Sequence, residues 1–159
     1  MRMANAALQQ GYETLTARIG QPSEPTDWFE MTQQRIDEFA DATLDRQWIH
    51  IDPERARAGP FGAPIAHGQL TMSLMSFLPG GEGIGLPVLD GMRMGINYGW
   101  NRVRFPSPVA VGAQIRTWGE IRSVEVKGEM LEVVNRLTVE VRGQPKPACV
   151  GESVLRLVF

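Results

Sequence analysis

The sequence contains a single cysteine, Cys149, among 159 residues. One cysteine supports neither an internal disulfide framework nor a thiolate metal cluster, so both are excluded. Cys149 lies in a segment with the alternation of a strand, where we expect it to be a small buried apolar residue.

The chain also lacks an excess of basic charge. It has 16 Lys and Arg residues against 18 Asp and Glu residues, which gives a formal net charge of −2. A surface for nucleic acid needs clustered Lys and Arg to neutralise several phosphates. We therefore expect no nucleic-acid partner.

Long hydrophobic runs are absent as well. The most apolar run, residues 66–78, would rise roughly 20 Å as a helix at about 1.5 Å per residue, whereas a membrane span needs about twenty residues. The first residues, MRMANAALQQGYETL, lack the apolar stretch of a signal peptide. We expect a cytoplasmic protein with no membrane partner.

The length and composition indicate one domain. A chain of 159 residues with 43% hydrophobic residues can bury a core of its own. We predict a single domain over residues 1–159, in which residues 1–20 form a peripheral N-terminal extension.

The apolar run 66–78 predicts a buried helix at the centre of the fold, because it carries no Asp, Glu, Lys or Arg on any face. Gly68 opens this helix without a side chain, where backbone N–H groups are unpaired and the helix dipole is positive. A ligand carbonyl could approach there. We interpret the helix start as one half of an active site.

Two shorter helices are predicted before it. Thr32 is a good N-cap, and apolar or small residues follow at helical spacing: Ile36, Phe39, Ala40 and Thr43. Asp52 followed by Pro53 marks the start of a second helix, which we expect to run to about Ala58.

The C-terminal half has the alternation of strands. We predict strands over residues 94–105, 113–126, 129–142 and 148–158, with Lys127-Gly128 as a hairpin turn. The first strand changes its apolar phase near Val103, which predicts a bulge, and Gly95 and Gly99 leave room for the buried helix. Together these elements predict an α+β fold in which a curved antiparallel sheet wraps one helix.

Three spaced motifs resemble those of the MaoC-like dehydratases, which include the (R)-specific enoyl-CoA hydratases. They are Asp45-Arg-Gln-Trp-Ile-His50, Ile65-Ala66-His67-Gly68, and Ser76. Residues 95–109 further resemble the nodulation protein N-like branch, and the resemblance extends over about residues 26–158. One departure is Gln47-Trp48, where many members have Asn-Pro.

The resemblance implies a hot-dog fold with a long central helix, and reversible addition of water to a trans-2-enoyl thioester of CoA or acyl carrier protein. It implies Asp45 and His50 as the catalytic pair, the Gly68 N–H as oxyanion donor, and Ser76 as the group that orients Asp45. The reaction needs water at C3, a proton at C2 and a stabilised enolate oxygen. We expect no metal or other cofactor.

The resemblance and the unpaired edge that such a sheet leaves both predict a homodimer or a higher oligomer. Spacing alone leaves other roles open for the site residues. Asp45 could cap a loop and His50 could be a hydrogen-bonded loop residue, while we interpret His67 as structural. Three basic residues are either CoA phosphate ligands or merely solvated: Arg102, Arg104 and Lys146.

Two other functions stay open. A hot-dog thioesterase usually needs a carboxylate on or near the central helix, and residues 66–78 contain none. A non-catalytic acyl-CoA-binding protein would not need the set formed by Asp45, His50, Gly68 and Ser76.

Overall fold

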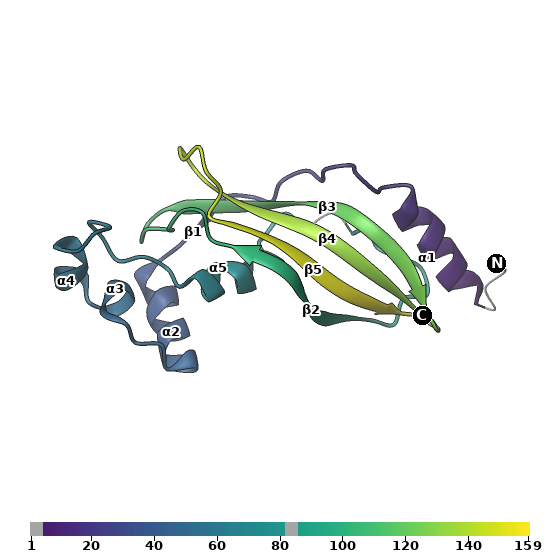
Figure 1. Ribbon diagram of the computed structural model, residues 1–159, viewed down its shortest axis with the longest axis horizontal. Helices are drawn as coiled ribbons and strands as arrows, with labels where there is room; N and C mark the ends of the chain where they lie inside the picture. The colour runs from purple at the N-terminus through teal and green to yellow at the C-terminus, as the bar shows by residue number, and fades with distance from the viewer. Residues whose placement is uncertain (1–4, 82–85) are drawn as a thin grey trace.

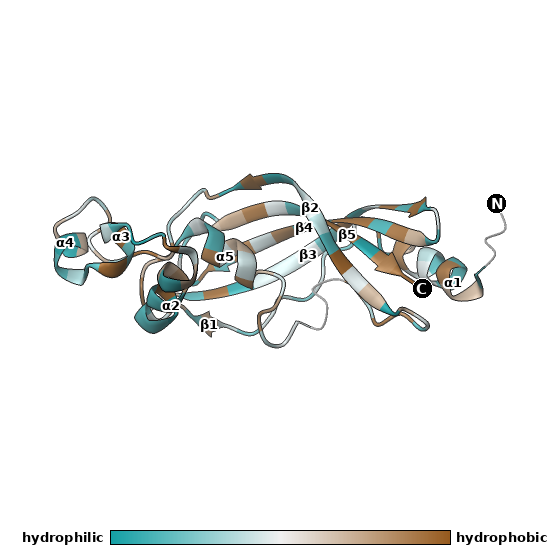
Figure 2. Ribbon diagram, turned by 90° about the horizontal axis from the view of Figure 1, so that it is seen from below, coloured by the Kyte–Doolittle hydropathy of each residue, from teal (hydrophilic) through white to brown (hydrophobic). Residues whose placement is uncertain are grey.

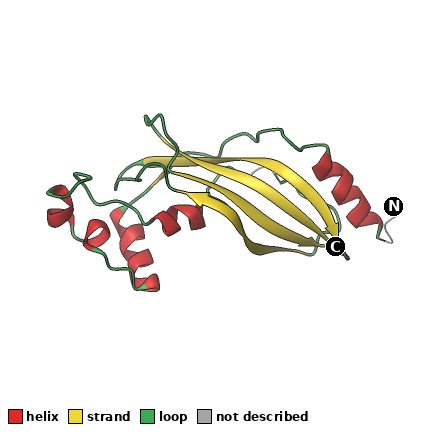
Figure 3. Ribbon diagram, in the orientation of Figure 1, coloured by secondary structure: helices red, strands yellow, loops and turns green. Residues whose placement is uncertain are grey.

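A computed structural model describes residues 5–81 and 86–159, and it shows one curved antiparallel sheet with helices near both ends (Figure 1). The strand order is β1-β3-β4-β5-β2. The strands are β1 Phe29–Glu30, β2 Met94–Arg104, β3 Gln114–Lys127, β4 Met130–Val141 and β5 Cys149–Val158. The helices are α1 Ala6–Thr16, α2 Gln33–Thr43, α3 Trp48–Ile51, α4 Pro53–Arg57 and α5 Gly68–Leu74. Helices α2 to α5 gather at one end and α1 lies at the other (Figure 3).

The predicted α+β fold and its strands are confirmed. On β4 one face is buried and the other faces outward, as the alternation predicts; the buried residues are Leu131, Val133, Leu137, Val139 and Val141. Lys127 pairs with Met130, and Gly128 turns the chain with a φ of 64°. Figure 2 shows the same alternation of apolar and polar residues across the long strands.

Strand β2 bends as predicted but does not receive the helix. Its pairing with β5 shifts register between Asn97 and Gly99 and again between Trp100 and Val103. The expectation that the buried helix packs on Gly95 and Gly99 is wrong. A Cβ at Gly99 would meet no atom within 4 Å, and one at Gly95 would meet only the side chain of Leu157 of β5, at 3.5 Å.

The central helix is shorter than predicted. Helix α5 has seven residues, and the chain then turns, with the Phe77 N–H donating to the oxygen of Leu74. Within the helix, the Ser73 hydroxyl donates to the oxygen of Gln69 at 2.8 Å, a bond that competes with regular helix geometry. Pro79 then has no N–H and disfavours helical backbone in the preceding residue. Helix α5 therefore covers only part of the sheet's buried face.

Helix α1 packs against the other end of that face. Leu8 and Leu15 are buried in a cluster with residues of β3, β4 and β5. A Cβ at Gly11 would lie 2.6 Å from the ring of Phe159, so the glycine allows this close contact. The segment expected to be peripheral thus contributes to the core. No helix within the described ranges is long and apolar enough to cross a membrane.

Candidate active site

Asp45 lies in the loop that joins α2 to α3. Helix α2 ends at Thr43, and its C-cap Leu44 has a left-handed backbone (φ 65°) that redirects the chain immediately before Asp45. Gln47 is the N-cap of α3, and the ring of Trp48 lies 4.5 Å from the guanidinium carbon of Arg55. The two residues that depart from the family pattern therefore start and anchor the helix that carries His50.

His50 is buried and fixed by a backbone carbonyl. Its Nδ1 lies 2.6 Å from the oxygen of Ile65. A carbonyl oxygen can only accept, so Nδ1 carries the hydrogen and Nε2 is left with a lone pair. Burial lowers the pKa of His50 below its ordinary value, and the bond to Ile65 and the charge of Asp45 oppose this more weakly. The side chain is thus suited to act as a neutral base.

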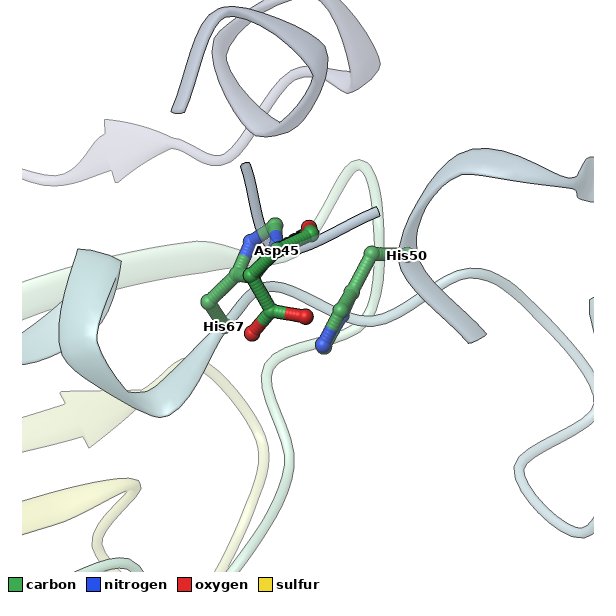
Figure 4. A group of neighbouring side chains, drawn as sticks. All are labelled: Asp45, His50 and His67. Carbon is green, nitrogen blue, oxygen red and sulfur yellow. Dashed lines mark hydrogen bonds between the residues drawn. The ribbon is translucent and has the colours of Figure 1, made fainter. Parts of the chain in front are cut away.

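Asp45, His50 and His67 converge. One carboxylate oxygen and one ring nitrogen from each histidine all lie within 4.8 Å of one another (Figure 4). The two imidazole rings stack with centroids 3.7 Å apart, and His67 Nε2 lies 2.9 Å from the backbone oxygen of Asp45. The family resemblance implies the first two residues as a pair, whereas the sequence does not indicate these two contacts of His67.

A cavity of about 360 Å³ brings His50 and Gly68 together. It is lined by residues from α3, the α4–α5 loop, the start of α5 and the loop after β2, among them Ile49, Phe61 and Phe105. The Gly68 N–H has no hydrogen-bond acceptor within the described ranges. The amide is therefore free to donate to a ligand oxygen in this cavity.

The three converging groups do not suit a metal ion. The ring nitrogens left with a lone pair are His50 Nε2 and His67 Nδ1, since the other two are bonded to carbonyl oxygens. A ligating nitrogen lies about 2.0–2.1 Å from zinc, with its lone pair in the ring plane. Stacked rings inclined by 26° cannot both direct such lone pairs at one ion.

The structure does not bring Ser76 to Asp45. Ser76 follows the end of α5 and lines a different, mainly apolar cavity of about 600 Å³, together with residues such as Asn97, Leu137 and Leu155. Within the described ranges, no hydrogen bond joins Ser76 to Asp45. Its orienting role stays a prediction.

Replacing Ser76 by Ala tests that role. From the placement in the structure we expect no measurable loss of kcat, since the hydroxyl supports neither Asp45 nor His50. Loss of an outer hydrogen-bond partner would instead cost about 10- to 100-fold. Initial rates of enoyl-CoA hydration distinguish the two, with Ser73→Ala as the control on the same segment. A loss in that range, for Ser76→Ala alone, would contradict the placement.

The basic residues expected near CoA phosphates are divided between two places. Arg102 and Arg104 line a cavity with Arg122 and Arg136, on the side of the sheet opposite the buried residues of β4. Lys146 lies in the loop before β5, where its backbone oxygen accepts from Ser107 at 3.2 Å. None of the three lines the cavity that contains His50 and Gly68.

The chain is similar to known proteins along most of its length. Residues 14–142 match the family described as "MaoC like domain". The chain belongs to this family. Among its relatives, 3-hydroxyacyl-thioester dehydratase Z of Mycobacterium tuberculosis is 46% identical over 145 residues, which cover 91% of this chain and 93% of the relative. Nodulation protein N of Rhizobium leguminosarum bv. viciae is 40% identical, covering 90% and 88%.

Solved structures support the fold of this MaoC-like domain. The (R)-hydratase from A. caviae involved in PHA biosynthesis superposes with a TM-score of 0.65 at 27% identity, covering 86% of this chain and 94% of that one. The MaoC-like dehydratase from Rhodospirillum rubrum gives a TM-score of 0.69 at 20% identity, covering 89% and 92%. The predicted hot-dog class is therefore confirmed, with a central helix shorter than expected.

Proposed function

We propose that this MaoC-like domain is an (R)-specific enoyl-thioester hydratase, which also runs in reverse as a 3-hydroxyacyl-thioester dehydratase. One observation carries the proposal: the Asp45 carboxylate lies within 4.8 Å of a ring nitrogen of His50, and His50 shares a cavity with the unpaired Gly68 N–H. A relative of 46% identity is named a 3-hydroxyacyl-thioester dehydratase, and a similar structure is an (R)-hydratase.

In this proposal each group of the site has a distinct role in the reaction. The carboxylate of Asp45 and Nε2 of His50 can each accept a hydrogen from one water molecule held between them. As the water oxygen bonds to C3, the pair takes one of its protons, and the electrons of the double bond move toward the thioester oxygen. The Gly68 N–H stabilises the enolate oxygen, and the pair then returns a proton to C2. Atoms and charge balance without a metal or a redox cofactor.

The natural substrate in this proposal is a thioester of CoA or acyl carrier protein, in the cytoplasm. The cavity beside His50 and Gly68 accepts the thioester end. The larger apolar cavity that includes Ser76 offers room for an acyl chain, because apolar residues form most of its wall.

An assay on crotonyl-CoA separates this function from a thioesterase and from a binding protein. Hydration removes the absorbance of the conjugated enoyl thioester without releasing thiol. We expect that result, with the (R)-3-hydroxy product identified by chiral chromatography. Thiol release would instead support hydrolysis, and binding with neither change would support a non-catalytic protein. Helix α5 carries no carboxylate that could direct water at the thioester carbon.

We also propose that two copies associate through β2. This strand forms one edge of the sheet, and its outer backbone groups are unpaired within the described ranges. Large apolar side chains are exposed along it, including Met94 (54%), Ile96 (40%) and Tyr98 (58%). An edge of this kind favours pairing with the same edge of a second copy, which gives a two-fold interface.

A lysine in the middle of this edge should block the pairing. We expect Ile96→Lys to sediment as a single chain of 17.7 kDa, whereas the unchanged protein sediments at about twice that mass or a multiple of it. Glu129→Lys, at the exposed β3–β4 turn, is the matched control and should leave the mass unchanged. A monomeric unchanged protein, or an associated Ile96→Lys variant, would contradict the β2 interface.

A further inference from the structure

His67 is a buried side chain that the proposed mechanism does not use. Only 1% of its surface is exposed, and although it is the N-cap of α5 it makes no side-chain capping bond. Its Nε2 lies instead 2.9 Å from the backbone oxygen of Asp45. Since a carbonyl oxygen only accepts, Nε2 carries the hydrogen and donates it across to the Asp45 loop.

The second nitrogen of His67 supports the same arrangement. Nδ1 is buried and has no hydrogen-bond partner in the described part of the chain. A hydrogen on Nδ1 would therefore be a buried donor without an acceptor, which is costly. The surroundings select the tautomer with its hydrogen on Nε2, the one that can hold Asp45.

The ring of His67 also supports His50. The two rings stack with centroids 3.7 Å apart, and Phe39 of α2 packs against His67 with centroids 5.0 Å apart. His50 is thus held at its edge by the oxygen of Ile65 and on its face by His67. Figure 4 shows His67 close to both members of the pair. One short segment, residues 65–67, fixes both groups relative to Gly68.

We propose that His67 is a positioning residue that holds the Asp45 backbone and the His50 ring in the arrangement needed for hydration. The proposal rests on the proposed function. Asp45 is exposed and follows a residue with left-handed backbone, so its loop has little packing of its own. Because reacting groups displaced by about 1 Å can lose a hundredfold in rate, a bond that restrains this loop affects catalysis.

Two substitutions separate the two contacts of His67. His67→Phe keeps a ring that can stack on His50 but removes the donor, whereas His67→Gln keeps an N–H donor but removes the stacked ring. We expect each to lower kcat for crotonyl-CoA hydration by about 10- to 100-fold, while KM stays within about threefold. Rates are expressed per folded protein, as measured by circular dichroism.

Phe39→Leu is the matched control. It changes the packing behind His67 but removes neither the bond to Asp45 nor the stack on His50. We expect it to lower thermal stability and to keep kcat. If His67 were purely structural, all three variants would have lower thermal stability and an unchanged kcat. That result would overturn the proposal.

A double substitution tests whether His67 acts through Asp45. In an Asp45→Asn background, the further loss from His67→Phe should nearly vanish, because residues that act as one unit are not additive. If the fold-losses in kcat of the two single variants multiply in the double variant, the proposal is overturned. An increase in KM at constant kcat would also overturn it, since His67 would then shape the substrate cavity rather than position the pair.

The unchanged protein offers a test that needs neither a variant nor activity. Imidazole nitrogen NMR should show His67 as the tautomer with its hydrogen on Nε2, and the Nδ1–H tautomer would overturn the bond to Asp45. If the expected tautomer is seen but crotonyl-CoA is not hydrated, the proposed function fails while the tie between His67 and Asp45 stands.

Discussion

Replacing Asp45 by Asn is expected to lower kcat for crotonyl-CoA hydration by at least about a hundredfold, the usual scale for loss of a positioned acid or base. The amide has the shape of the carboxylate but cannot take up the proton of the attacking water. Because the Asp45 side chain is exposed and its loop is held through a backbone oxygen, the fold should persist. Loss of enoyl absorbance measures the rate, and circular dichroism checks the fold.

His50→Gln should show a loss of the same size. Glutamine can still donate an N–H toward the oxygen of Ile65, which His50 Nδ1 approaches to 2.6 Å, but it has no basic nitrogen in place of Nε2. The variant therefore separates the structural bond of His50 from its proton transfer.

Asp52→Asn is the control for both substitutions. The Asp52 carboxylate caps α4, accepting the Arg55 N–H at 3.0 Å, and it is not among the converging groups of the site. It should retain the kcat of the unchanged protein. Turnover near that of the unchanged protein in Asp45→Asn or His50→Gln would remove the residue concerned from the mechanism.

The strands and caps could be predicted from sequence because their signals are local. On β4 the alternation from Leu131 to Val141 follows the geometry of a strand, in which successive side chains point to opposite faces. The caps at Thr32 and Asp52 depend on a side-chain oxygen and the N–H three residues later, and both bonds are formed. No distant contact is needed to recognise these signals.

The length of α5 could not be predicted in the same way. The residue pattern of an uncharged run is compatible both with one long helix and with a shorter helix followed by a turn. Here the chain turns after Leu74. Ser76, which the sequence places within the helix, lies instead in the turn that follows Leu74. A family motif specifies the type of residue at a position but not the backbone conformation there.

The role of His67 depended on contacts between distant segments. Its partners are Asp45, 22 residues earlier, and the ring of His50. Hydrophobic periodicity relates residues within one helix or strand. It could not show that His50 of α3 stacks on His67, the N-cap of α5. The Ile-Ala-His-Gly motif was a usable signal, because it placed a polar ring at the start of an apolar segment.

Gly68 is the second residue whose replacement should have a large effect. A Cβ on Gly68 would lie 3.1–3.2 Å from ring atoms of Phe105, closer than ordinary van der Waals contact. The start of α5 or the Phe105 ring must therefore shift in Gly68→Ala. We expect kcat to fall by at most about the 10²- to 10³-fold that losing one oxyanion donor costs, because the amide is displaced but not removed. Gly99→Ala, with nothing of its own chain within 4 Å of the added carbon, is the control and should keep its activity.

A Phe105→Ala background separates crowding from the loss of the amide hydrogen. With the ring removed, the methyl group of Gly68→Ala has space, and kcat should return to that of Phe105→Ala alone. Gly68→Pro in the same background removes the N–H itself. Proline fits the first position of a helix, and His67 (φ −58°, ψ 139°) already has the extended backbone required before a proline.

We expect the proline double variant to be about 10²- to 10³-fold slower in kcat than the alanine double variant, because the two differ chiefly in the oxyanion donor. The Gly68 amide has no acceptor of its own within the described ranges, so its loss breaks no backbone hydrogen bond there. Thermal unfolding should accordingly show two folded proteins of similar stability. Equal kcat values in these two variants would assign the enolate oxygen to another donor and leave Gly68 as a residue required only by the ring of Phe105.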